Sequence, residues 1–133
     1  MNKIFIFLYC ALASAYALSC PVSPISRTAY YSDSILEKSD VMFLGRLESE
    51  SREENSLLQM ATFTVLESYK GNVSGKVTVK NELRTSCSRA FKVVGQKFYV
   101  FALKTAKKNV FKMPHTATFI PLGNAEELNW SPK

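Results

Sequence analysis

Three cysteines and one histidine are the residues of this chain that could carry covalent or metal chemistry. A Cys–His nucleophile pair would need a reduced cysteine beside His115, and export, inferred below, favours oxidised cysteines. A His-rich zinc set cannot be built from one histidine. The sequence contains no HExxH motif, no GxSxG motif and no phosphate-binding glycine loop. It therefore predicts neither an enzyme nor a cofactor of the protein's own.

Cys20 could act through its backbone if it became the first residue of the mature chain. Its free α-amine would titrate near pH 8, so a fraction of it would be neutral at physiological pH. That amine and the backbone carbonyl of Cys20 together form a bidentate chelate. A catalytic zinc keeps one coordination position for water, which such a chelate could displace. In this hypothesis Cys20 is a ligand, in trans, to the catalytic zinc of another protein.

Residues 1–19 have the composition of a secretory signal peptide. Lys3 precedes the apolar run "IFIFLYCALASAYAL", which ends in small residues. The run falls short of the roughly 20 residues that a transmembrane helix needs, so we expect no transmembrane span. Cleavage before Leu18 and cleavage before Cys20 both satisfy the small-residue rule, and lipidation of Cys20 is a third alternative. We expect a secreted protein, extracellular or periplasmic.

Export leaves two cysteines in the mature chain, because Cys10 is removed with the signal peptide. An oxidising compartment favours a disulfide between Cys20 and Cys87. This bond would join the amino terminus to the middle of the chain, and it would hold the Cys20 amine and carbonyl in a fixed position. Residues 20–133 are long enough for one compact domain and too short for two.

The elements that must position these cysteines are mostly strands. Period-two alternation, or an apolar run between turn signals, predicts five of them. We also expect a short helix capped by Ser32 or Asp33, a second short helix near the carboxyl end, and an irregular lead-in. The expected strands span 40–50, 58–69, 76–80, 96–104 and 109–113, the helices 34–39 and 124–130, and the lead-in 25–31. The count and length favour a mainly β fold, a five-stranded OB-type Greek-key barrel with short flanking helices; a sandwich is the alternative.

Basic residues are in excess, and the formal net charge is +6. They are spread along the chain, which is typical of a solvated surface, with a polyanion contact as the alternative. Aromatic residues alternate with basic ones, as they do in OB barrels that stack bases. We expect these rings in the core, and we expect no nucleic acid as a partner of an exported chain. The rings are Phe63, Tyr69, Phe98, Tyr99, Phe101 and Phe111.

The chain resembles the amino-terminal, netrin-like domain of the tissue inhibitors of metalloproteinases, in a single-domain form. The resemblance covers about residues 20–122. It is carried by the signal peptide running into "CP", by "SDVMFLGRL", by "FTVLESYKG", and by "TSCSRAF", which places a cysteine 67 positions after Cys20. It implies an OB barrel that inhibits a zinc metalloproteinase.

The resemblance also implies roles for single residues. Cys20 would be the zinc chelator and Pro21 the residue that enters the specificity pocket of the protease. Four more residues would contact the protease beside them: Val22 and Ser23 along the same ridge, and Thr85 and Ser86 on the adjoining edge. A netrin-like OB binding module that recognises protein or polyanion at the cell surface, with a purely structural disulfide, is the alternative function.

Overall fold

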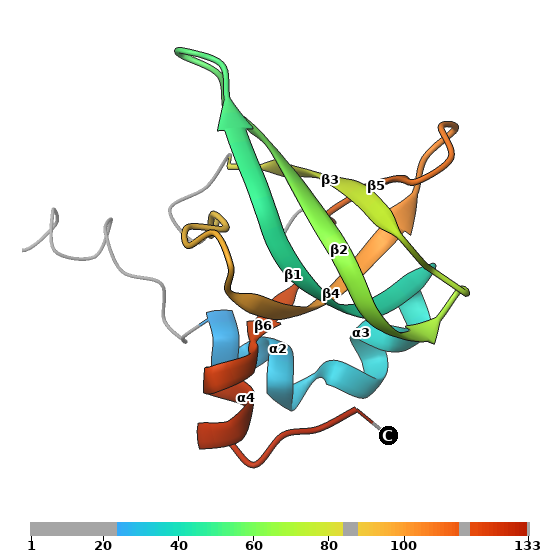
Figure 1. Ribbon diagram of the computed structural model, residues 1–133. Coiled ribbons are helices and arrows are strands. Elements are labelled where there is room, and N and C mark those ends of the chain that lie inside the picture. The colour runs from blue at the N-terminus through green and yellow to red at the C-terminus, as the bar shows by residue number, and fades with distance from the viewer. Residues whose placement is uncertain (1–23, 84–87, 115–117, 133) are drawn as a thin grey trace, which may run out of the picture.

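The computed structural model describes residues 24–83, 88–114 and 118–132 (Figure 1). Within them the chain forms a β-barrel with helices packed on its outer side. The strands are β1 (Val41–Arg52), β2 (Leu58–Lys70), β3 (Lys76–Glu82), β4 (Lys97–Lys104), β5 (Val110–Lys112) and β6 (Phe119–Pro121). The helices are α2 (Pro24–Tyr30), α3 (Ser32–Lys38) and α4 (Leu122–Glu127).

Five of these strands close into a barrel. The sheet order is β1-β2-β3-β5-β4-β6, and β1 also pairs with β4, so the ring returns to its first strand. The pairs are antiparallel except for β3 and β5, which run parallel. The predicted five-stranded OB-type Greek-key barrel is confirmed, and the sandwich alternative is wrong.

Strand β1 bends so that it can pair on both of its edges. Its register against β2 shifts at three places, one of them between Leu44 and Gly45, where a glycine inside a strand favours a bulge. A Cβ on Gly45 would lie 2.9 Å from the Phe43 ring and 3.2 Å from Cβ of Phe63. Gly45 therefore lets the bent strand lie close to the core.

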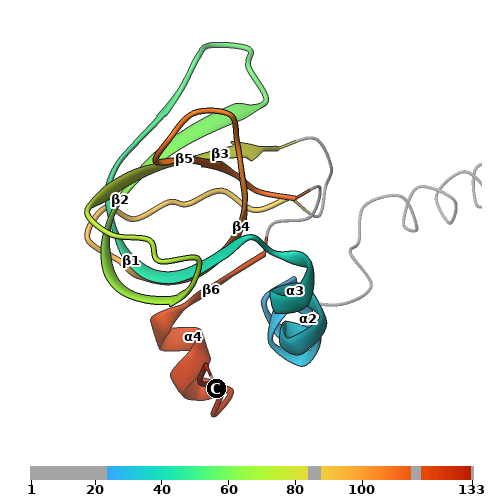
Figure 2. The same cartoon turned by 90° about the vertical axis from the view of Figure 1, so that its right-hand side faces the viewer.

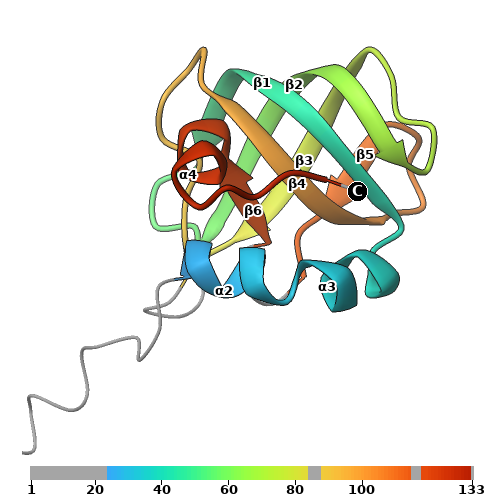
Figure 3. The same ribbon diagram turned by 90° about the horizontal axis from the view of Figure 1, so that it is seen from below.

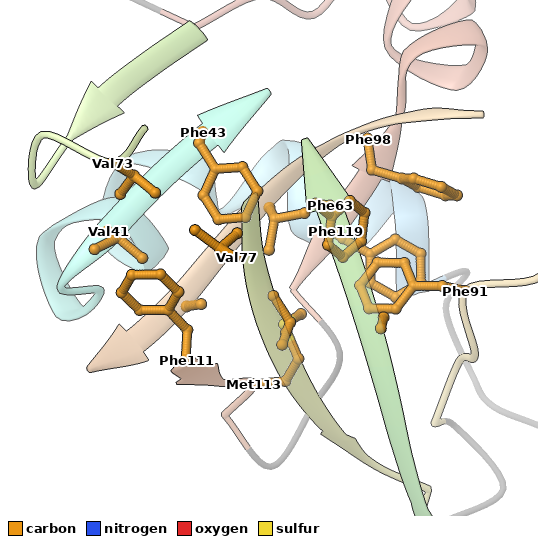
Figure 4. Packing of buried hydrophobic residues seen from close by; sticks show 14 of the residues in the cluster. Val41, Phe43, Phe63, Val73, Val77, Phe91, Phe98, Phe111, Met113 and Phe119 are labelled. Atoms are coloured by element: carbon orange, nitrogen blue, oxygen red, sulfur yellow. The ribbon is translucent and has the colours of Figure 1, made fainter. Parts of the chain in front are cut away.

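The barrel interior is filled by the inward-facing side chains of every strand of the ring (Figure 4). The alternation expected for β1 is confirmed, since Val41, Phe43 and Leu47 are completely buried. At one end of the core the rings of Phe63, Phe91, Phe98 and Phe119 gather. Phe91 stacks on Phe119 with ring centroids 4.2 Å apart and meets Phe63 edge to face at 4.9 Å.

Strand β4 is covered on both faces, as its continuous apolar run predicts. Phe98, Val100 and Ala102 point into the barrel. Tyr99 and Phe101 point outward and belong to a second apolar cluster, in which the helices pack on the barrel. In Figure 2 helices α2, α3 and α4 lie below the barrel, and Figure 3 shows them from that side.

The structure corrects four details of the sequence prediction. Residues 24–30 form helix α2 rather than an irregular lead-in, because Ile25 and Ala29, four residues apart, both pack on the outer cluster. Helix α3 begins after Tyr31, and no side chain caps it. Strand β6 was not predicted. Tyr69 packs in the outer cluster rather than in the barrel core, because the bulges of β1 shift the register against β2.

Gly71→Ala should destabilise the protein more than Gly75→Ala. Both glycines have positive φ, 85° and 73°, so either substitution strains the backbone. A Cβ on Gly71 would also lie 2.7 Å from Val41 and 2.8 Å from the Asp40 carbonyl oxygen, whereas nothing lies within 4 Å of one on Gly75. In urea denaturation we expect losses of about 3 kcal/mol and about 1 kcal/mol respectively. Equal losses would show that the clash at Gly71 is relieved.

Candidate functional site

All the predicted protease-binding residues lie outside the described part of the chain, and so does His115. The Cys20–Cys87 disulfide and the zinc-chelating role of Cys20 therefore stay predictions. The residues are Cys20, Pro21, Val22, Ser23, Thr85, Ser86 and Cys87. The described residues that flank these two segments show where the segments join the barrel.

The flanking residues meet at one end of the barrel. Ile25 in α2 follows the first segment, and Leu83 and Ser88 bracket the second. All three line the same cleft, of about 590 Å³, which we call the end cleft. Its other described walls are Arg52, Arg89, Ala90, Lys92, Val93, Gln96, Phe98, Phe119 and Pro121. Two segments that lie more than 60 residues apart in the sequence thus join the barrel at one cleft.

Two buried amide side chains hold the chain that follows the second segment. Gln59 Nε2 donates to the Phe91 carbonyl at 2.7 Å, and the Phe91 N–H donates to Gln59 Oε1 at 3.0 Å. Asn81 Nδ2 donates to the Arg89 carbonyl at 2.7 Å and to Gln59 Oε1 at 3.2 Å. Gln59 and Asn81 are 0% and 1% exposed. We call Gln59 and Asn81 the amide clamp. Their side chains make hydrogen bonds to the backbone of residues 89–91 much as a neighbouring strand would.

Arg89 closes the cleft against β6. Its Nη2 donates to the Phe119 carbonyl at 2.6 Å, and its guanidinium carbon lies 4.1 Å from the centre of the Phe119 ring. Burial lowers the pKa of Arg89 to about 10, because the charged form loses water. The side chain is nevertheless cationic at neutral pH. Arg89 therefore adds a positive charge to a partly apolar wall.

Backbone hydrogen bonds fix both ends of the connection between β3 and β4. The Leu83 N–H donates to the Leu57 carbonyl at 2.6 Å, just before the second segment. Farther along, the Gly95 N–H donates to the Leu47 carbonyl at 2.7 Å, and the Leu47 N–H donates to the Gln96 carbonyl at 2.9 Å. The described parts of this connection are thus held against β1 and the start of β2.

The rim of the end cleft is basic and apolar. Arg52 and Lys92 are exposed there, in addition to the partly buried Arg89. Val93, which lines the cleft, and its neighbour Val94 are each 59% exposed. Exposed apolar side chains beside charged ones are typical of a protein-binding surface.

The described residues include no group of three or more His, Cys, Asp or Glu side chains that could hold a metal ion. None of the helices among them is long and apolar enough to cross a membrane. Neither a scan of protein-family models nor a search of curated proteins finds a match to this chain.

The sequence analysis missed the amide clamp, although the sequence contains a signal for it. Gln59 has the same parity along β2 as the buried Ala61 and Phe63. Asn81 has the same parity along β3 as Val77 and Val79. A polar residue at an inward-facing position must find hydrogen-bond partners, so two of them predict a buried polar network. Only the register, which pairs Gln59 with Asn81, shows that they share it.

Gln59→Leu should destabilise the protein by about 2–4 kcal/mol, because it leaves the buried N–H and carbonyl of Phe91 without partners. We expect Asn81→Leu to cost less, and the double variant to cost clearly less than the sum of the two. A double-mutant cycle in urea measures the coupling, expected at 1 kcal/mol or more. Additive losses would mean that the two amides act independently.

Proposed function

We propose that this protein is a secreted inhibitor of a zinc metalloproteinase. Cleavage before Cys20 frees the α-amine, and the amine and carbonyl of Cys20 then chelate the catalytic zinc of the protease. The observation that carries the proposal is the end cleft, which Ile25, Leu83 and Ser88 line together. The two segments that hold the proposed binding residues both adjoin it.

Chain length supports the proposed disulfide. Cys20 lies five residues before Ile25, and an extended segment of that length reaches about 17 Å. Cys87 is the direct neighbour of Ser88. A disulfide needs Cα atoms about 5–6 Å apart, which this reach allows across a single cleft. The amide clamp and the Leu83–Leu57 hydrogen bond would hold the second segment while the first is tethered to it.

Inhibition would follow from chelation of the protease zinc by Cys20. A neutral amine and a carbonyl oxygen would take the zinc position that water occupies in the free protease, and without that water peptide hydrolysis stops. Pro21 would then enter the adjoining pocket of the protease. Val22, Ser23, Thr85 and Ser86 would contact its surface. A disulfide would hold the chelate rigid, which limits the entropy lost on binding.

The test is the state of the amino terminus. The secreted protein is sequenced from its amino end, and its inhibition of a panel of zinc metalloproteinases is measured. A chain that begins at Cys20 should inhibit, and one alanine appended before Cys20 should weaken inhibition by about 100-fold or more. The extra residue turns the Cys20 amine into an amide nitrogen, which is a poor zinc ligand, and it moves the free amine to a residue that the disulfide does not hold. An alanine appended at the carboxyl end is the matched control. The proposal would be contradicted by a secreted chain that begins at Leu18, or by equal inhibition from the variants with alanine at the amino and at the carboxyl end.

A binding module for a polyanion is the second candidate function, and one arrangement of lysines favours it. Lys80 and Lys112 are exposed, and the strand register places them side by side on β3 and β5. Like charges in register destabilise a sheet unless an anion lies over them. Nearby, Lys104, Lys107 and Lys108 line a cavity of about 300 Å³. The rings of β2, β4 and β5 that could stack on bases are buried, apart from the partly buried Tyr69, which supports a polysaccharide over a nucleic acid.

A double variant in which both Lys80 and Lys112 are replaced by Gln should elute from a heparin column at a lower salt concentration. The salt dependence of binding should fall by roughly 0.7–0.9 in log–log slope for each lysine that contacts an anion. The matched control replaces Lys38 and Lys97, which are also exposed but lie elsewhere. If both double variants elute alike, the charge is diffuse and the protein has no dedicated site.

A further inference from the structure

A second cavity lies on the helical side of the barrel, away from the end cleft. It is bounded by α3, by the outer face of the barrel and by the carboxyl-terminal tail, and its volume is about 430 Å³. Figure 1 shows the tail passing beneath the barrel beside α3. Trp130 Nε1 donates to Ser32 Oγ at 3.0 Å, which fastens the tail to the helix. We call this space the aromatic cavity.

Aromatic rings form much of its wall. Tyr30, Tyr69, Phe101 and Trp130 all line it. The ring centroids of Phe101 and Trp130 are 6.3 Å apart. Tyr99 connects Trp130 with Tyr69, because its ring centroid lies 5.0 Å from that of Trp130 and 6.0 Å from that of Tyr69. Tyr69, Tyr99, Trp130 and Phe101 therefore form one connected aromatic group, whereas the ring of Tyr30 contacts that of Tyr31. Aromatic rings attract a cation that lies over their faces.

The charge of the lining has the opposite sign to that of the chain. Asp33 is its one charged residue among those described, although the net charge of the protein is +6. By contrast, the end cleft contains Arg52, Arg89 and Lys92. Lys70, which lies next to Tyr69 in the chain, does not line the cavity, and its Nζ donates to the Leu36 carbonyl at 2.8 Å. Among the described residues of this lining, a cation would therefore meet no like charge.

Tyr69 adds to the negative potential without being ionised. Its hydroxyl donates to Glu67 Oε2 at 2.8 Å, which places a second carboxylate beside the ring. Burial, followed by this hydrogen bond, raises the pKa of Tyr69 well above its usual range, so the phenol is neutral at every physiological pH. Tyr69 thus holds the Glu67 carboxylate close to a cavity whose lining includes Asp33.

We propose that the aromatic cavity binds an organic ammonium group, either tertiary or quaternary. A primary ammonium carries three N–H donors that the aromatic part of the lining cannot satisfy, whereas a quaternary group carries none. Alkyl groups around the nitrogen pack on the rings while the charge interacts with their faces and with Asp33. The volume is within the range of sites for small molecules. This site is separate from the proposed protease contact, so either can fail without the other.

Fluorescence tests the proposal directly, because Trp130 is the single tryptophan of the chain and lines the cavity. The full-length protein is titrated with choline and with 3,3-dimethyl-1-butanol, which has the same shape and no charge. We expect a saturable change in Trp130 emission with choline and at least about tenfold weaker binding of the alcohol. Equal binding of both would overturn the proposal, and so would a response to neither choline nor the vesicles described below.

Two pairs of variants locate the site. Tyr30→Leu should weaken choline binding about threefold or more, whereas Tyr31→Leu should not, because Tyr31 is adjacent and exposed but does not line the cavity. Asp33→Asn should weaken it, whereas Glu37→Gln on the same helix should not. All four side chains lie outside the buried core, so each variant should fold, and thermal unfolding checks this. Equal effects within either pair would overturn the assignment.

The same ammonium group can belong to a free amine or to a lipid headgroup, so phosphatidylcholine vesicles are compared with choline in solution. A change in Trp130 emission with soluble choline assigns the site to a free amine. A change with vesicles alone, reduced by Tyr30→Leu but not by Tyr31→Leu, assigns it to a lipid headgroup. Either result supports an ammonium site.

Discussion

Strand β4 is the element on which the rest of the structure depends, because it is buried on both faces. Its inward side chains close the barrel core, and its outward ones form the floor on which the helices pack. Phe98 on one face lines the end cleft, and Phe101 on the other lines the aromatic cavity. The hydrophobic effect that holds this strand in place therefore also positions both candidate sites.

The end cleft is held by polar contacts as much as by apolar ones. A connection between strands would normally be the least ordered part of a small barrel. Here the amide clamp makes hydrogen bonds to residues 89 and 91, and Phe91 inserts into the core among the rings of Phe63 and Phe119. The described part of this connection would therefore lose little conformational entropy on binding, which suits the role proposed for the residues beside it.

Charge is distributed unevenly between the two sites. The end cleft and the lysines on β3 and β5 are positive, whereas the one charged residue in the described lining of the aromatic cavity is Asp33. The electrostatic interaction between exposed charges is screened within about 8–10 Å in physiological salt. Regions of opposite charge can therefore coexist on one small barrel and attract different partners. The proposed protease contact and the proposed ammonium site therefore lie in regions of opposite charge on the same barrel.

The sequence by itself determined the five barrel strands and the two-sided burial of β4, and it favoured a barrel over a sandwich, because period-two alternation and apolar runs depend only on which face each residue buries. It did not determine helix α2, strand β6 or the outward packing of Tyr69, because these depend on bulges and on contacts with distant residues. For the candidate site, the sequence identified Cys20 and Cys87 by their chemistry. Only the tertiary structure brought Ile25, Leu83 and Ser88 to one cleft and paired Gln59 with Asn81, because strand register and barrel closure are long-range constraints that no local pattern contains.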